Sequence, residues 1–218
     1  MKVLKPPQSG SLSGTTASRN RFGQYERTRA IPVNPNSGAQ GVVRARMAAN
    51  SAAWRALTSA QRAGWGDLGL SMVRSDSLGQ SYSLQGNQAY ASVNNNRVAT
   101  AVAVVADAPA LATPVALLTV TVTLTATAFS IAFTATPLGA ATYLMVFASP
   151  QRSAGRNFEG DFRLIKVSAA AAASPFVVLT EYTAKFGVPV SGNRIFISLL
   201  TETLGFDSGP FNLSQVVA

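Results

Sequence analysis

The chain of 218 residues contains no cysteine and no histidine. These absences exclude disulfides, thiolate nucleophiles and zinc sites built from Cys or His ligands. They also remove the side chain that most often acts as a general base. The nine acidic residues are scattered, and only Glu159 and Asp161 stand close together, which we expect in a solvated loop. The sequence therefore predicts a protein that is not an enzyme and that holds no metal or other cofactor.

No apolar run is long enough to cross a membrane. The most apolar stretch, residues 98–148, is interrupted by Asp107 and by several prolines. A spanning helix needs about 20 predominantly apolar residues. The first ten residues, MKVLKPPQSG, turn polar before the apolar segment of a signal peptide could form. We therefore expect a soluble protein with no membrane partner.

Positive charge is concentrated in the first half of the chain. Residues 1–110 carry 12 lysines and arginines against four acids, whereas residues 111–218 contribute only +1 to the total of +9. Long-range attraction to acidic partners therefore belongs to the N-terminal half.

Composition divides the chain into three sections. Residues 1–35 are rich in Arg, Pro, Ser, Gly and Thr. They bury too little apolar surface to offset their ordering entropy, so we expect an extended basic arm that only a partner orders. Residues 36–107 are expected to form a small helical docking section, and residues 108–218 a β-sandwich. The predicted fold class is α+β.

Three short helices are expected in the docking section. Val43, Met47, Trp54 and Leu57 recur on one helical face. Thr58 and Gln61 have capping-box spacing, which places a second helix start at Thr58. This helix is expected to bury Ala60, Gly64, Leu68 and Met72, although its glycines 64, 66 and 69 each cost about 1 kcal/mol against alanine. A turn at 76–79 and a third helix over 85–98 follow, and the asparagines at 94–96 are expected to end that helix.

A period of two replaces the helical period after residue 114. Apolar residues alternate with Thr or Ser over 120–125 and 129–134, which is typical of half-buried strands. Further strands are expected at 142–148, 162–167, 176–182, 194–200 and 211–217. Seven short strands separated by turn residues predict an antiparallel β-sandwich. The alanine run at 169–173 fits a helical turn or a flexible loop equally well.

Two segments resemble known families. Residues 193–200 (NRIFISLL) and 205–210 (GFDSGP) resemble the closing hairpin of a fibronectin type III or related immunoglobulin-like domain. Residues 32–35 (PVNP), 54–58 (WRALT), 78–82 (LGQSY) and 94–97 (NNNR) resemble the N-terminal region of uncharacterised virion-associated proteins of tailed bacteriophages and prophages. The second resemblance covers residues 20–100 and implies a structural role in a virus particle, without catalytic residues.

Partner contacts are expected on the arm and the helices. The candidate residues are Arg19, Arg21, Arg27, Arg29, Arg44, Arg55, Arg62 and Trp65. Arginine forks pair well with carboxylates, which favours an acidic protein partner over nucleic acid. No aromatic ladder or zinc-finger signature supports the nucleic-acid alternative. Trp54 is expected in the core, whereas Trp65 fits a core or an interface position equally well.

The resulting hypothesis is a structural protein of the virion, most plausibly a capsid decoration or cement protein. It would dock onto major capsid or tail subunits and form a homo-oligomer within a symmetric assembly. A tail or fibre adhesin whose sandwich binds a glycan is one alternative, and a basic nucleic-acid-binding protein is another. The loop at 152–157 is expected to be solvated, with contact to a ligand or a neighbouring subunit as its alternative.

Overall fold

The computed structural model describes residues 9–20, 23–31, 33–76, 78–134 and 136–218. The chain divides into two compact units, Met1–Val43 and Arg44–Ala218, and each is described by itself. Helices and antiparallel sheets both occur, so the fold class is mixed α+β, as the sequence predicts.

The first unit contains a three-stranded antiparallel sheet, formed by β1 (Gly10–Leu12), β2 (Thr15–Asn20) and β3 (Gly23–Thr28). The prediction of an extended arm is therefore wrong for these residues. Ser13, at φ 54°, begins the turn that joins β1 to β2. The described side chains of the sheet are exposed or half-buried, and Leu12 is 82% exposed. Main-chain pairing shapes this sheet, and its described side chains form no hydrophobic core.

Helix α1 (Gly38–Ala56) crosses the boundary between the two units. Its start is capped reciprocally: the main-chain N–H of Ser37 donates to Oε1 of Gln40 at 3.2 Å, and the main-chain N–H of Gln40 donates to Oγ of Ser37 at 3.4 Å. Such a cap satisfies two N–H groups that have no partner within the helix.

Two further helices and a hairpin follow. Helix α2 (Ser59–Ser71) follows Thr58, and the predicted capping box of Thr58 and Gln61 is confirmed. The hairpin of β4 (Val73–Ser75) and β5 (Ser81–Ser83) confirms the predicted turn. Helix α3 (Gly86–Ala99) then runs close to its expected bounds.

The helices pack around a small aromatic core. Trp65 lies edge-on to Tyr90 with ring centroids 5.1 Å apart. The other buried apolar members are Leu57, Leu68, Met72, Ala89, Val93 and Phe206. Ala60 is exposed, so its predicted burial is wrong: it lies on the outer face of α2. We call α1, α2, α3 and the β4–β5 hairpin the helical region.

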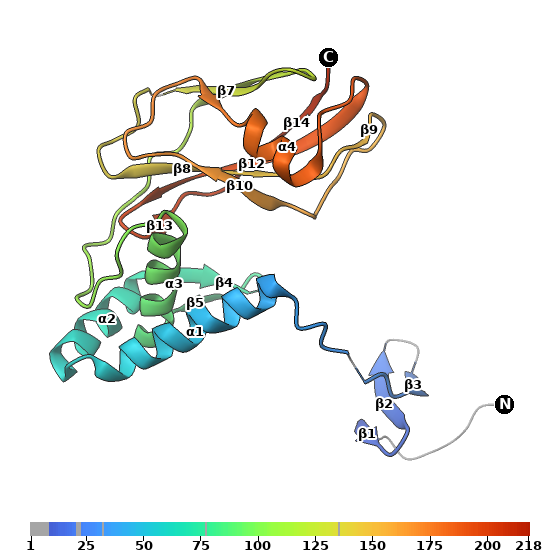
Figure 1. Ribbon diagram of the computed structural model, residues 1–218. Coiled ribbons are helices and arrows are strands. Elements are labelled where there is room, and N and C mark those ends of the chain that lie inside the picture. The colour runs from blue at the N-terminus through green and yellow to red at the C-terminus, as the bar shows by residue number, and fades with distance from the viewer. Residues whose placement is uncertain (1–8, 21–22, 32, 77, 135) are drawn as a thin grey trace. The chain divides into compact units, whose positions relative to one another are not determined.

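Residues 117–218, which we call the two-sheet region, contain two antiparallel sheets (Figure 1). The smaller sheet has the order β11 (Phe176–Val177), β7 (Phe129–Thr134), β6 (Thr119–Leu124). The larger has β10 (Arg163–Val167) and β8 (Thr142–Ala148) beside β12 (Asn193–Thr203), which also pairs with β9 (Arg152–Ser153), β13 (Phe206–Asp207) and β14 (Phe211–Val216). Both sheets contribute to one core, which includes Phe129 and Ile131 of β7 and Ile195 and Ile197 of β12.

One predicted strand is largely replaced by a helix. The expected strand at 176–182 ends after Val177, and α4 (Leu179–Phe186) follows. Leu179, Tyr182 and Phe186 recur at helical spacing and pack against the core, and Tyr182 is fully buried. Its hydroxyl donates to the main-chain oxygen of Ser149 at 3.2 Å. Tertiary packing of this amphipathic face outweighs the local preference for a strand.

Candidate interaction surfaces

The arginines of the first unit do not gather on one face of its sheet. Arg19 lies opposite Gln24, and Arg27 lies opposite Thr16. Because successive strand residues point to opposite faces, Arg19 and Arg27 lie on different faces. Arg29 follows β3 and is exposed, and its main-chain N–H donates to the oxygen of Gly14 at 2.8 Å. Arg21 lies outside the described residues.

The N-terminal half of α1 is exposed on every side. Val43 and Met47 continue the helical face of Trp54 and Leu57, yet they are 59% and 47% exposed. Residues 41–49 are all exposed. Contact with α3 begins at Met47, whose Sδ accepts from Nδ2 of Asn95 at 3.8 Å, and burial begins at Asn50, whose Nδ2 donates to Oδ1 of Asn95 at 2.9 Å. The protein therefore covers this helical face in its C-terminal half only.

Arg55 and Arg62 come together where α1 ends. Nη2 of Arg62 donates to the main-chain oxygen of Arg55 at 3.1 Å and to that of Leu57 at 2.8 Å, and its Nε also donates to Leu57. Arg62 therefore satisfies carbonyls at the helix C-terminus, where a cation is favourable. Its guanidinium has a structural role in addition to any partner contact, whereas Arg44 and Arg55 are exposed on α1 itself.

Trp65 has no exposed surface. Its Nε1 donates to the main-chain oxygen of Ala106 at 2.7 Å, so the polar atom of the indole is satisfied inside the protein. The proposed contact of Trp65 with a partner is incompatible with this position, and the core alternative is correct. Trp54 is half-buried and packs on Tyr90, with ring centroids 5.7 Å apart.

The asparagine run joins three parts of the chain. Asn94 is fully buried and bonds Val105 twice: its Oδ1 accepts from the main-chain N–H at 2.8 Å, and its Nδ2 donates to the oxygen at 3.2 Å. Asn95 bonds Asn50 of α1, and Nδ2 of Asn96 donates to the oxygen of Gly205 at 2.9 Å. The prediction that this run ends the helix is wrong, since α3 continues to Ala99. Consecutive residues of a helix point about 100° apart, so a helical run of three asparagines could have been predicted to contact three different neighbours.

Glu202 is a buried carboxylate between the helical and two-sheet regions. Its Oε1 accepts from the main-chain N–H of Gly205, whereas Oε2 is buried with no hydrogen-bond partner in the described part of the chain. Burial raises its pKa, and the main-chain hydrogen bond from Gly205 and the charge of Arg97 oppose that rise. Asp207 raises it further. A lone carboxyl group of this kind tunes stability, and the described residues contain no cluster of three potential metal ligands.

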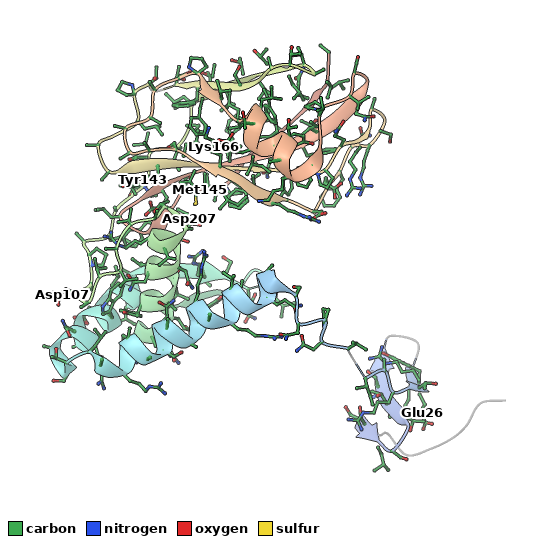
Figure 2. The ribbon with its side chains drawn as sticks, viewed as in Figure 1. Glu26, Asp107, Tyr143, Met145, Lys166 and Asp207 are labelled. Carbon is green, nitrogen blue, oxygen red and sulfur yellow. The ribbon has the colours of Figure 1, made fainter. Side chains whose placement is uncertain are left out.

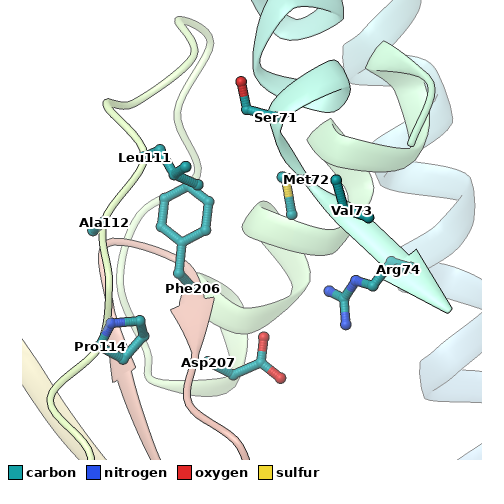
Figure 3. Close-up of a pocket in the computed structure, with 9 residues that line it drawn as sticks. All are labelled: Ser71, Met72, Val73, Arg74, Leu111, Ala112, Pro114, Phe206 and Asp207. Carbon is teal, nitrogen blue, oxygen red and sulfur yellow. The ribbon is translucent and has the colours of Figure 1, made fainter. Parts of the chain in front are cut away.

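A small open pocket of about 260 Å³ lies beside this junction (Figure 3). Met72, Leu111 and Phe206 give it apolar walls, and Arg74 and Asp207 line it with opposite charges. The volume is below the usual range for small-molecule sites, which begins at about 300 Å³. The pocket therefore gives little support to a cofactor or substrate.

Glu159 is not solvated as expected, because it is only 6% exposed. Its Oε2 accepts from Nε of Arg152 and lies 3.5 Å from Nε of Arg156, and its Oε1 accepts from the main-chain N–H groups of Gly160 and Asp161 at 3.0 Å each. The Asp161 main-chain bond and the Arg152 contact lower its pKa to about 2. The sequence did not predict this ion cluster. Arg152 and Arg156 precede Glu159 by seven and three residues in a loop, where no regular period indicates which side chains meet.

Searches against protein-family models and curated proteins find no match to the chain. The two resemblances given above therefore stay predictions from the sequence. No helix in the described residues is both long and apolar enough to cross a membrane.

Proposed function

We propose that this protein is a non-enzymatic structural subunit, anchored in a larger assembly through its N-terminal residues and the first half of α1. One observation carries the proposal: residues 41–49 of α1 are all exposed, although Val43 and Met47 continue a face that is covered further along the helix. Helices gain most of their stability from packing of such a face, so this half is expected to be covered by a partner.

Charge favours an acidic protein as that partner. Arg44 and Arg46 are exposed on the same half of α1, and Arg19, Arg27 and Arg29 are exposed in the first unit. Apolar side chains flanked by arginines are the composition of protein-interface hot spots. Binding to nucleic acid would use the arginines but would leave the aliphatic face of α1 uncovered.

The assembly that fits the sequence best is a virus particle of the tailed-phage type. The support is the resemblance of residues 20–100 to virion-associated proteins, and the role it favours is capsid decoration or cement, repeated as a homo-oligomer. The two-sheet region would then be an immunoglobulin-like or fibronectin III-like sandwich. Its two antiparallel sheets around a shared core and its closing strands β12 and β14 support that assignment.

Sedimentation of the full-length chain from cells that produce it tests the proposal. The wild type is expected in a heavy particle fraction, including after nuclease treatment. A double variant, Val42→Ser with Val43→Ser, is expected in the light fraction with an unchanged thermal midpoint, because both side chains are exposed on this half of α1. Val177→Ser, at a 55% exposed position of β11, is the matched control and should stay heavy. A light wild type, a nuclease-sensitive heavy fraction or a heavy double variant would contradict the proposal.

A further inference from the structure

We propose that the loop at residues 153–161 of the two-sheet region is a second docking site, which inserts Phe158 into an apolar recess on an acidic protein surface. This site is separate from α1, so the protein would bridge two partners. Phe158 is 78% exposed, the most exposed aromatic side chain among the described residues whose burial is given. Aromatic side chains are enriched at protein interfaces relative to the rest of the surface, which favours a binding role for Phe158.

Hydrogen bonds hold the loop on both sides of Phe158. Nε of Arg156 donates to the main-chain oxygen of Phe158 at 2.7 Å, and Nη1 of Arg194 donates to the oxygen of Arg156 at 3.0 Å and to Oδ1 of Asn157 at 3.3 Å. The adjacent Glu159 is buried in its arginine pair. The backbone on both sides of Phe158 is thus fixed before binding, which lowers the entropy lost when a partner associates.

Two further apolar side chains share this end of the two-sheet region. Val188 and Val190 are each 56% exposed. Nε2 of Gln151 donates to the oxygen of Val188, and Oε1 of Gln151 accepts from the main-chain N–H of Val190, both at 2.8 Å. Gln151 precedes Arg152, which pairs with Glu159, so these bonds connect the valine segment to the segment that leads into the Phe158 loop. The aliphatic valines favour an apolar protein recess, because they cannot stack on nucleotide bases as aromatic rings do.

The charge around the loop calls for an acidic partner. Arg152 and Arg156 share the single carboxylate of Glu159, and Arg194 donates to main-chain and amide oxygens, so three guanidinium groups meet one negative charge. Arginine beside an aromatic anchor is typical of interface hot spots. Carboxylates around the recess would complement these guanidinium groups.

A second copy of the chain does not offer that surface. All nine acids lie among the described residues; Glu159 and Glu202 are buried, and Asp161 and Glu181 already pair with Arg163 and Lys166. Asp107 and Asp207 stand on separate segments (Figure 2), where they accept from Gln61 and Asn96. The other three acids are also on separate segments of the chain: Glu26 in β3, Asp67 in α2 and Asp76 between β4 and β5. With a net charge of +9, two copies would also repel each other.

Binding of the full-length chain to synthetic 12-residue peptides tests the inference. One set has a central Leu or Trp flanked by Asp and Glu, and a matched set has Asn and Gln in place of the acids. The wild type is expected to bind the acidic set below about 1 mM and to prefer it over the amide set. Phe158→Ser should weaken binding at least about tenfold. Val177→Ser, exposed on β11, is the control and should bind as the wild type does.

Each other outcome overturns the inference. These outcomes are no binding to the acidic set, equal binding of both sets, unchanged binding by Phe158→Ser, and tighter binding of a single-stranded oligonucleotide. A marked fall in the thermal midpoint of Phe158→Ser would also overturn it, because the side chain would then be a packing element. The peptide assay does not depend on α1, so it can fail while the sedimentation result stands.

Discussion

The main chain at Gly205 lies directly against Val93 of α3. A Cβ at Gly205 would lie 2.9 Å from the main-chain oxygen of Val93 and would overlap its Cγ1. Gly205 also has a φ of +96°, a conformation that side chains disfavour. The turn between β12 and β13 therefore packs on α3 through its backbone, and Asn96 bonds the Gly205 oxygen at the same place.

Substitution of Gly205 tests this junction. Gly205→Ala is expected to lower the free energy of unfolding by about 3 kcal/mol, from about 1–2 for the left-handed conformation and about 1–3 for overpacking. Gly192 has a similar φ of +85°, but a Cβ there would meet nothing within 4 Å. Gly192→Ala should therefore lower the free energy of unfolding only by the contribution of the left-handed conformation. Denaturant unfolding measures both variants. Equal losses would show that contact with Val93 contributes nothing.

Replacing Gly66 or Gly69 of α2 by alanine should change the free energy of unfolding in opposite directions. A Cβ at Gly69 would lie 2.5 Å from the main-chain oxygen of Leu84, whereas one at Gly66 meets nothing within 4 Å. Gly66→Ala is therefore expected to stabilise the protein by up to about 1 kcal/mol through helix propensity. Gly69→Ala should destabilise it by about 1–3 kcal/mol through overpacking. Thermal and denaturant unfolding check the signs, and stabilisation by both substitutions would refute the close approach at Leu84.

Glu159 should stabilise the protein at neutral pH and lose this effect in acid. Its pKa falls from 4.5 to about 2 on folding, so the stabilisation is complete above about pH 5 and disappears as the pH falls toward 2. Glu159→Gln is expected to unfold at a lower temperature than the wild type at pH 7. The two midpoints should converge near pH 2. A difference that does not change with pH would contradict the ion cluster.

The effect of Glu202 on stability should depend on pH in the opposite direction. Its pKa is raised by burial, so the unfolded state ionises first and stability falls as the pH rises above about 4.5. Glu202→Gln is expected to be more stable than the wild type at pH 7, by about 1.4 kcal/mol for each unit of the rise, and equal to it below pH 4. Denaturant unfolding at the two pH values measures this. A less stable variant at pH 7 would mean that the ionised carboxylate is favoured there.

Most strands and helix starts could be predicted from periodicity and capping. The expected strand at 142–148 coincides with β8, and the Thr58 capping box begins α2. Strands β1, β2 and β3 were missed because their described side chains bury no apolar face, so the hydrophobic pattern gives no signal for a sheet there. Helix α4 was missed because Phe176 and Val177 favour a strand locally, whereas burial of Tyr182 decides the conformation.

The interaction surfaces were less predictable. Composition identified the basic residues, but only the fold separates Arg62, which caps α1, from Arg44 and Arg55. Trp65 could not be assigned from spacing, since its position depends on Ala106, 41 residues away. The conformation of the Phe158 loop likewise involves Arg194 of β12, which bonds the main-chain oxygen of Arg156, 38 residues away.

Hydrogen exchange of α1, measured in the isolated protein and in the heavy particle fraction, tests the central claim most directly. Alone, amides at 42–49 are expected to exchange faster than those at 50–56, because only the latter half is covered by the protein itself. In the assembly, amides at 42–49 should slow by at least about tenfold, while those at 50–56 change little. Identical exchange at 42–49 in both states would contradict the proposal that a partner covers this half of the helix.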